Sequence, residues 1–321
     1  MKLFNDEMKK SIIKKEEGKM VIMRQSIFTL TKNNPESSRL IVEETDFVEK
    51  IIAHLNTVQL KNLKYWHFQI LYNLCEYITD EQKGKLLHKG VIQTMVKMLD
   101  CKDEEVRMKA SQIISDIVIA AGEQVKEGVK HPYLKELANI GAVSKLIELL
   151  KDKECKGLSS IIVSTFSSIF KAEQLPPEIS AEVIDRLKEN DSFDEIALLA
   201  ESPANHDVIL SNNYEKKLSE DRSIWSIGFL RFVNSVLSVG SEENKNKIAP
   251  VVKKRVKDLS DDDKLDDFAQ EEGIDDEEKL LMKEKLKEIS ELLKKIVGDD
   301  DNDNNEEESS SDDKEDDDED D

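Results

Sequence analysis

Apolar positions recur along the middle of this chain at the spacing of amphipathic helices. Residues 142–150 carry apolar side chains at intervals of three and four, and residues 158–170 do so again after a polar link. Residues three and four apart share one face of an α-helix, so each stretch predicts a helix with a buried face. The same helix–link–helix pattern occurs at 91–118 and, less regularly, at 47–75. The sequence therefore predicts repeated helix pairs.

The pairs follow one another at a nearly constant interval. Asp46 and Gly90, which open the first two units, are 44 residues apart, and Gly90 and Gly141 are 51 apart because of an insertion near 126–135. Periods of about 40–47 residues are typical of α-solenoids, in which each pair buries its apolar face by stacking on the next. We therefore predict an all-α, right-handed solenoid of four to five repeats.

Later segments continue the helical pattern less regularly. Apolar residues within 179–187, 224–237 and 248–259 predict three further amphipathic helices. We expect the apolar stripe of 280–297 to cap the open end of the solenoid, because terminal repeats need a polar outer face. The predicted organisation is a partly helical N-terminal arm over 1–24, a repeat domain over 25–260, an acidic linker with a C-terminal helix over 261–298, and a disordered acidic tail over 299–321.

Negative charge is concentrated at the C-terminus. The chain has 321 residues and a formal net charge of −22; residues 299–321 hold sixteen acidic residues and one lysine, which leaves −7 for the other 298. Such a tail has too little apolar surface to fold, so we predict disorder. The mildly acidic body gives no electrostatic footprint for nucleic acid, and its acidity disfavours anionic membranes. We expect neither nucleic acid nor a membrane as a direct partner.

Residue types that carry chemistry are scattered. Cys75, Cys101 and Cys155 are widely spaced, and the sequence contains no glycine-rich phosphate loop and no histidine cluster. A disulfide framework, a zinc site and a nucleotide site are therefore not indicated. No apolar segment of secretory-signal or transmembrane type is found. We expect a protein without catalytic activity, metal or cofactor, located in the cytoplasm, the nucleus or both.

The second and third units resemble armadillo repeats. Each opens with a glycine and an apolar turn that leads into a helix, and Leu-Tyr-Asn-Leu at 71–74 matches the end of a third helix in that family. The resemblance implies a scaffold that binds a partner protein or an extended peptide on its concave face. In importin-alpha and the catenins, asparagines of the third helices clamp the peptide backbone. The corresponding positions here are Asn73, Asp116, Ser168 and Asn234.

A second resemblance implies an alternative function. Residues 73–78, 86–90 and 103–114 are similar to the armadillo nucleotide-exchange factors, which wrap a lobe of the seventy-kilodalton heat-shock chaperone and open its nucleotide cleft. A further alternative is an importin-like transport adaptor. Here Gln69 stands where importins carry a tryptophan, four residues before Asn73.

The acidic tail contains a candidate modification site. Ser309 and Ser310 each precede an aspartate by three residues. This spacing resembles the sites of acidophilic casein-type kinases, and a phosphate would add negative charge to the tail. Acidic tails attract basic proteins, and they also keep a chain soluble. Both roles are open alternatives for residues 299–321.

Overall fold

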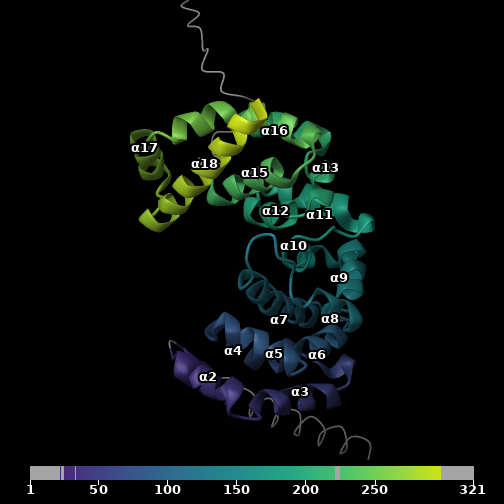
Figure 1. Cartoon of the computed structure of the whole chain (residues 1–321). Coiled ribbons are helices and arrows are strands. Elements are labelled where there is room, and N and C mark those ends of the chain that lie inside the picture. Colours follow the sequence, from purple (N-terminus) through teal and green to yellow (C-terminus); the bar gives the residue numbers. More distant parts are fainter. Residues whose placement is uncertain (1–21, 23–24, 33, 221–224, 298–321) are drawn as a thin grey trace, which may run out of the picture.

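The helices of this protein stack in the order of the sequence into one curved column (Figure 1). The computed structural model describes residues 22, 25–32, 34–220 and 225–297. All regular secondary structure in these ranges is helical, from α2 (Pro35–Glu43) to α18 (Asp276–Val297). The all-α repeat architecture predicted from the apolar spacing is therefore confirmed. The predicted N-terminal arm, apart from residue 22, and the predicted tail with Ser309 and Ser310 lie outside the described residues.

One helix from each unit contributes to a central layer. Each of these helices packs against the next along the chain, and outer helices cover them. The three inner helices of this layer are buried nearly all round, because each lies between two other central helices. The central helices are α4 (Gln69–Tyr77), α7 (Glu104–Glu123), α10 (Ser159–Ile169), α12 (Phe193–Ala200) and α15 (Ile227–Val239).

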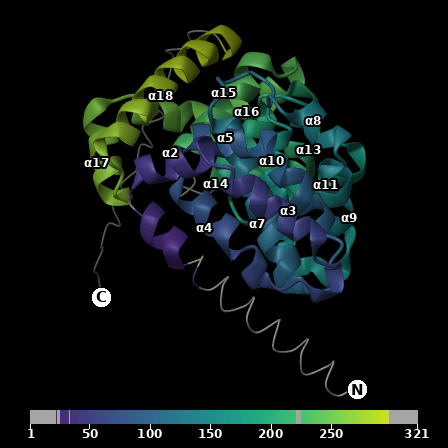
Figure 2. The ribbon, with the colours of Figure 1, turned by 90° about the horizontal axis from the view of Figure 1, so that it is seen from below.

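The outer helices cover this layer from one unit to the next. When the molecule is seen from below, the successive units lie behind one another, with α17 and α18 at one side (Figure 2). The outer helices are α3 (Phe47–Thr57), α5 (Asp80–His88), α6 (Val91–Met98), α8 (Leu134–Asn139), α9 (Ala142–Lys151), α11 (Pro177–Glu189), α13 (His206–Ile209), α14 (Tyr214–Glu220) and α16 (Glu242–Leu259).

Helix α5 is one of the short helices that apolar spacing did not predict. Its sequence is mostly charged, and only Leu86 and Leu87 among its apolar side chains are buried. A capping box at its start is the local signal: the Thr79 hydroxyl accepts a bond from the Gln82 backbone amide, and the Gln82 side chain accepts one from Thr79 N–H. The helix therefore depends on its cap and on packing against α7.

The C-terminal region differs in part from the prediction. Residues 261–277, expected as an acidic linker, contain helix α17 (Asp262–Glu272), whose Leu265 and Phe268 are buried. Helix α18 packs against α15 and α16 and closes this end of the stack. Its buried face consists of Met282, Leu286, Ile289 and Leu293. The sequence around α17 is so rich in aspartate that its short apolar stripe did not indicate a helix.

Two units begin at glycines with a left-handed backbone. Gly90 (φ 81°) precedes α6, and Gly141 (φ 78°) precedes α9. The Gly141 N–H donates to the carbonyl of Ala138 at 3.0 Å, so the chain reverses within one turn from α8 into α9. A Cβ atom is strained in this conformation, and glycine is therefore required by the turn itself.

We expect Gly141→Ala to lower the free energy of unfolding by about 1–2 kcal/mol. No atom lies within 4 Å of a Cβ built on Gly141, so the cost comes from the backbone alone. Gly141→Asn should cost less, because asparagine tolerates this region better. Urea denaturation followed by circular dichroism measures both changes.

Gly84→Ala is the matched control, because Gly84 lies inside α5 with an ordinary helical backbone. Alanine favours the helix interior by about 1 kcal/mol over glycine, so this change should stabilise the protein. A loss of stability of the same size in both alanine variants would contradict the assignment.

Candidate functional site

Two adjoining hollows run along the central helices. The first, of about 470 Å³, lies among α7, α10, α12 and α15, and the second, of about 710 Å³, lies among α7, α10, α11 and α12. Ser164 and Glu195 line both, and the Ser164 hydroxyl donates to the Glu195 carboxylate at 3.0 Å. We call the two hollows together the central groove. The stacking of the helices therefore creates one continuous surface across four units.

Two of the four predicted partner-binding residues lie at the central groove. Asp116 lines the second hollow, and burial raises the pKa of its carboxyl group, although Lys83 and Lys109 partly counteract this. Ser168 lines the first hollow, but its side chain is buried and its hydroxyl donates to the carbonyl of Val118 at 3.4 Å. Ser168 therefore serves the contact between α7 and α10 as well as the groove.

The other two predicted residues lie away from the central groove, toward the two ends of the stack. Asn73 is buried; its Oδ1 accepts a bond from Gln69 at 2.8 Å, and Phe28 of the helical residues 25–31 lines the same small cavity. Asn234 donates from Nδ2 to the Glu288 carboxylate of α18 at 3.2 Å. Thus only Asp116 and Ser168, of the four predicted partner-binding residues, lie at the central groove.

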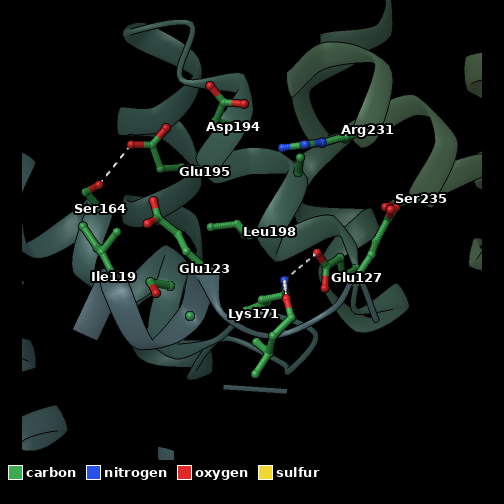
Figure 3. Close-up of a pocket in the computed structure, with 15 residues that line it drawn as sticks. Ile119, Glu123, Glu127, Ser164, Lys171, Asp194, Glu195, Leu198, Arg231 and Ser235 are labelled. Carbon is green, nitrogen blue, oxygen red and sulfur yellow. Dashed lines mark hydrogen bonds and ion pairs between the residues drawn. The ribbon is translucent and has the colours of Figure 1, made fainter. Parts of the chain in front are cut away.

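The first hollow is lined mainly by charged residues that were not among the predicted partner-binding residues. Glu123 comes from α7, Asp194 and Glu195 come from α12, and Arg231 extends from α15 toward α12 (Figure 3). The available signal was helical spacing, because Glu123 lies seven residues after Asp116 and so on the same face of α7. The hollow therefore presents more carboxylates than cations.

A buried ion pair holds the loop that borders the first hollow. Lys171 and Glu201 are 3.5 Å apart, and their side chains are only 6% and 8% exposed. The Lys171 ammonium also donates to the carbonyl of Val125, and the Glu201 carboxylate accepts the N–H of Gly128 at 2.9 Å. Burial raises the pKa of Glu201, while Gly128 and Lys171 lower it in part. The pair thus fixes the path of the chain after α7.

Two of the three buried histidines, His131 and His206, make hydrogen bonds that suit a neutral imidazole. His131 Nε2 donates to the carbonyl of Val118 at 3.0 Å, and its Nδ1 accepts the N–H of Tyr133. His206 Nε2 donates to the carbonyl of Ala200 at 2.7 Å, while its buried Nδ1 has no partner. Burial lowers the pKa of both imidazoles. Protonation would place an uncompensated charge in the core.

The described residues carry charged and polar binding groups along the central groove. They contain no group of three histidines, cysteines or carboxylates that could hold a metal ion. All three cysteines are buried, and burial raises the pKa of the Cys75 thiol to about 12. Among the helices so described, none is long and apolar enough to cross a membrane. Carboxylates and backbone groups along the central groove are suited to bind cations and peptide amides.

Comparison with solved structures supports the helical repeat fold. No protein-family model matches the sequence, and no curated protein matches it. An engineered protein from the Northeast Structural Genomics Consortium superposes with a TM-score of 0.58 at 18% identity, over 88% of this chain and 67% of its own. A designed armadillo repeat protein is 16% identical over 85% of this chain and 92% of its own, with a TM-score of 0.38.

A further designed armadillo repeat protein, in complex with the peptide (KR)4, is 16% identical over 83% of this chain and 91% of its own, with a TM-score of 0.37. The two designed armadillo proteins superpose too loosely to bear on the fold. The superposition on the engineered protein described first supports the helical repeat fold, and it concerns the fold alone.

The two neutral histidines predict a loss of stability in mild acid. In the unfolded chain both imidazoles titrate near pH 6.5, whereas in the folded chain their pKa values are lowered. Stability from the neutral forms is therefore present above about pH 6.5 and is lost as the pH falls through the unfolded-state pKa. We expect the Tm to fall less between about pH 7.5 and about pH 5.5 in the double variant His131→Gln/His206→Gln than in the native chain.

His54→Gln is the control for this measurement, because His54 is an exposed residue. Its Tm should follow the native pH dependence. An unchanged slope in the double variant would show that His131 and His206 do not set the pH response.

Proposed function

We propose that this protein is a non-enzymatic scaffold that binds an extended, basic segment of a partner protein in the central groove. The observation that carries the proposal is the excess of carboxylates there: Glu123, Asp194 and Glu195 face a hollow whose one exposed cation among the lining residues is Arg231. Carboxylates bind lysine and arginine through charge-assisted hydrogen bonds, which are stronger than neutral ones. A basic segment therefore complements this surface.

The apolar lining favours long basic side chains. Ile119 of α7 and Leu198 of α12 are half-buried in the first hollow, between the carboxylates. Lysine and arginine cover apolar surface with their methylene stems while the charged head stays at the polar rim. The hollow can thus hold the stem against Ile119 and Leu198 and the head near Glu123 or Glu195.

The length of the central groove limits the segment that it accepts. Asp116 and Ser235 mark its ends, on α7 and α15, and α10 and α12 lie between. Three steps between packed helices span about 30 Å, which corresponds to about nine extended residues. Beyond these ends, Asn73 lines a small cavity together with Phe28, and Asn234 donates a hydrogen bond to Glu288 of α18.

We expect the triple variant Glu123→Gln/Asp194→Asn/Glu195→Gln to bind a fluorescein-labelled, lysine- and arginine-rich nonapeptide about ten-fold more weakly than the native chain. Three partly exposed ion pairs contribute roughly 0.2–1 kcal/mol each, and 1.4 kcal/mol is a factor of ten. Fluorescence anisotropy at low ionic strength measures the Kd, and added salt should weaken native binding.

Glu154→Gln/Glu178→Gln/Glu271→Gln is the matched control, because it removes three exposed carboxylates that do not line the central groove. This variant should retain nearly native affinity. The proposal fails if native protein binds the basic peptide no better than a glutamate-rich peptide of equal length, or if both triple variants lose affinity equally.

The nucleotide-exchange and importin-like alternatives stay predictions. Nucleotide exchange is tested by release of a fluorescent nucleotide from the seventy-kilodalton chaperone, with and without this protein. Acceleration would replace the present proposal with the co-chaperone alternative. Cytoplasmic or nuclear location likewise stays a prediction. Recruitment of a basic protein by the acidic tail also stays a prediction, and it agrees with a basic partner.

A further inference from the structure

Helix α16 presents a basic stripe to solvent. Lys253, Lys254 and Lys257 lie within about 100° of one another around the helix axis, since each residue turns the helix by about 100°. Val252 and Val256 belong to the buried face of α16, which adjoins the stripe at Lys253. Lys254 and Lys257 are exposed and Lys253 is half-buried. In a chain with a net charge of −22, this stripe is a local reversal of sign.

Lys253 and Lys254 differ from the lysines at the start of the same helix. Lys245 and Lys247 each pair with a glutamate of the preceding turn, at 3.0 and 2.7 Å. No carboxylate among the described residues lies within ion-pair distance of Lys253 or Lys254. The two ammonium groups therefore provide an electrostatic surface that the folded helices leave unneutralised.

The chain leaves the helical stack beside this stripe. Helix α18 packs along α16, with the Ser260 and Ser290 hydroxyl groups 3.3 Å apart, and its last turn ends next to α16 (Figure 1). That last turn adds exposed Lys294 and Lys295. We call Lys253, Lys254 and Lys257 together with Lys294 and Lys295 the C-terminal basic face.

We propose that the C-terminal basic face is the docking surface of this chain's own acidic tail, residues 299–321. The tail begins directly after α18 and carries sixteen acidic residues against one lysine, so its charge complements the face. Twenty-three residues can reach at most about 76 Å when extended, which exceeds the length of about 27 Å of α16. The tail can therefore lie along the whole face.

Tethering favours the tail over an external polyanion. A short flexible link raises the effective concentration of the tail at the face to the millimolar range, which a free ligand in a cell rarely reaches. Contacts between many carboxylates and several lysines need no fixed register, so docking does not depend on one particular pairing. This inference does not rest on the proposed function, because the C-terminal basic face and the central groove share no residue.

A zero-length carbodiimide cross-link on the full-length chain tests the docking. The reagent joins a carboxylate to an amine only when the two are in contact, and mass spectrometry identifies the pairs. We expect tail carboxylates to couple to Lys253 and Lys254 at least five-fold more than to Lys151 and Lys153, which are exposed and distant in the stack. The yield should not depend on protein concentration, and about 0.5 M salt should reduce it at least five-fold.

Reversing charges on the C-terminal basic face shows whether electrostatic attraction, and not only the covalent tether, brings the tail to this face. In full-length Lys254→Glu/Lys295→Glu, coupling of the tail to the remaining Lys253 should fall at least three-fold. The matched control Lys151→Glu/Lys153→Glu should leave it unchanged, with circular dichroism showing that both variants fold. The proposal is overturned by an unchanged Lys253 yield in the first variant, by coupling spread evenly over exposed lysines, or by products formed only between molecules. It is equally overturned if heparin binds the face while the tail couples to none of its lysines.

Discussion

The burial of each central helix between its neighbours is the constraint on which the rest of this structure depends. Phe166 of α10 and Phe229 of α15 are fully buried, as are Ile113 and Ile114 of α7. No single helix pair could hide these side chains, so each unit requires the next. The glycine turns before α6 and α9 serve the same end, because they let an outer helix fold back onto the central layer within one turn.

This stacking explains why the groove lies on rigid elements. Residues on equivalent faces of successive central helices fall into a line, which places Asp116, Ser164 and Glu195 along one surface. The loop after α7 is the exception, and there the buried pair of Lys171 and Glu201 holds the backbone through Val125 and Gly128. A buried pair is weak evidence for stability, since desolvation offsets its attraction. The effect of the pair here is to fix the position of the loop after α7.

Periodicity predicted the long helices because their apolar faces are wide, as in residues 142–150. It failed at α5 and α17, where charged residues outnumber the few that are buried and where caps and tertiary packing decide the helix. The groove was predicted only in part for a related reason. Asn73 lines a cavity with Phe28, and Asn234 bonds to Glu288; these neighbours are distant in sequence, and no local pattern contains that information.

The distribution of charge connects the proposed binding at the central groove with the proposed docking of the tail. The central groove and the tail are both acidic, so an undocked tail would compete with the groove for the same basic partner. A tail held on the C-terminal basic face neutralises that face and leaves the groove as the acidic surface that a basic segment meets. Phosphorylation at Ser309 or Ser310 would add charge and so strengthen the docked state. At physiological salt, charges further apart than about 8 Å hardly attract each other. Docking of the tail therefore depends on proximity, which the path of α18 along α16 provides.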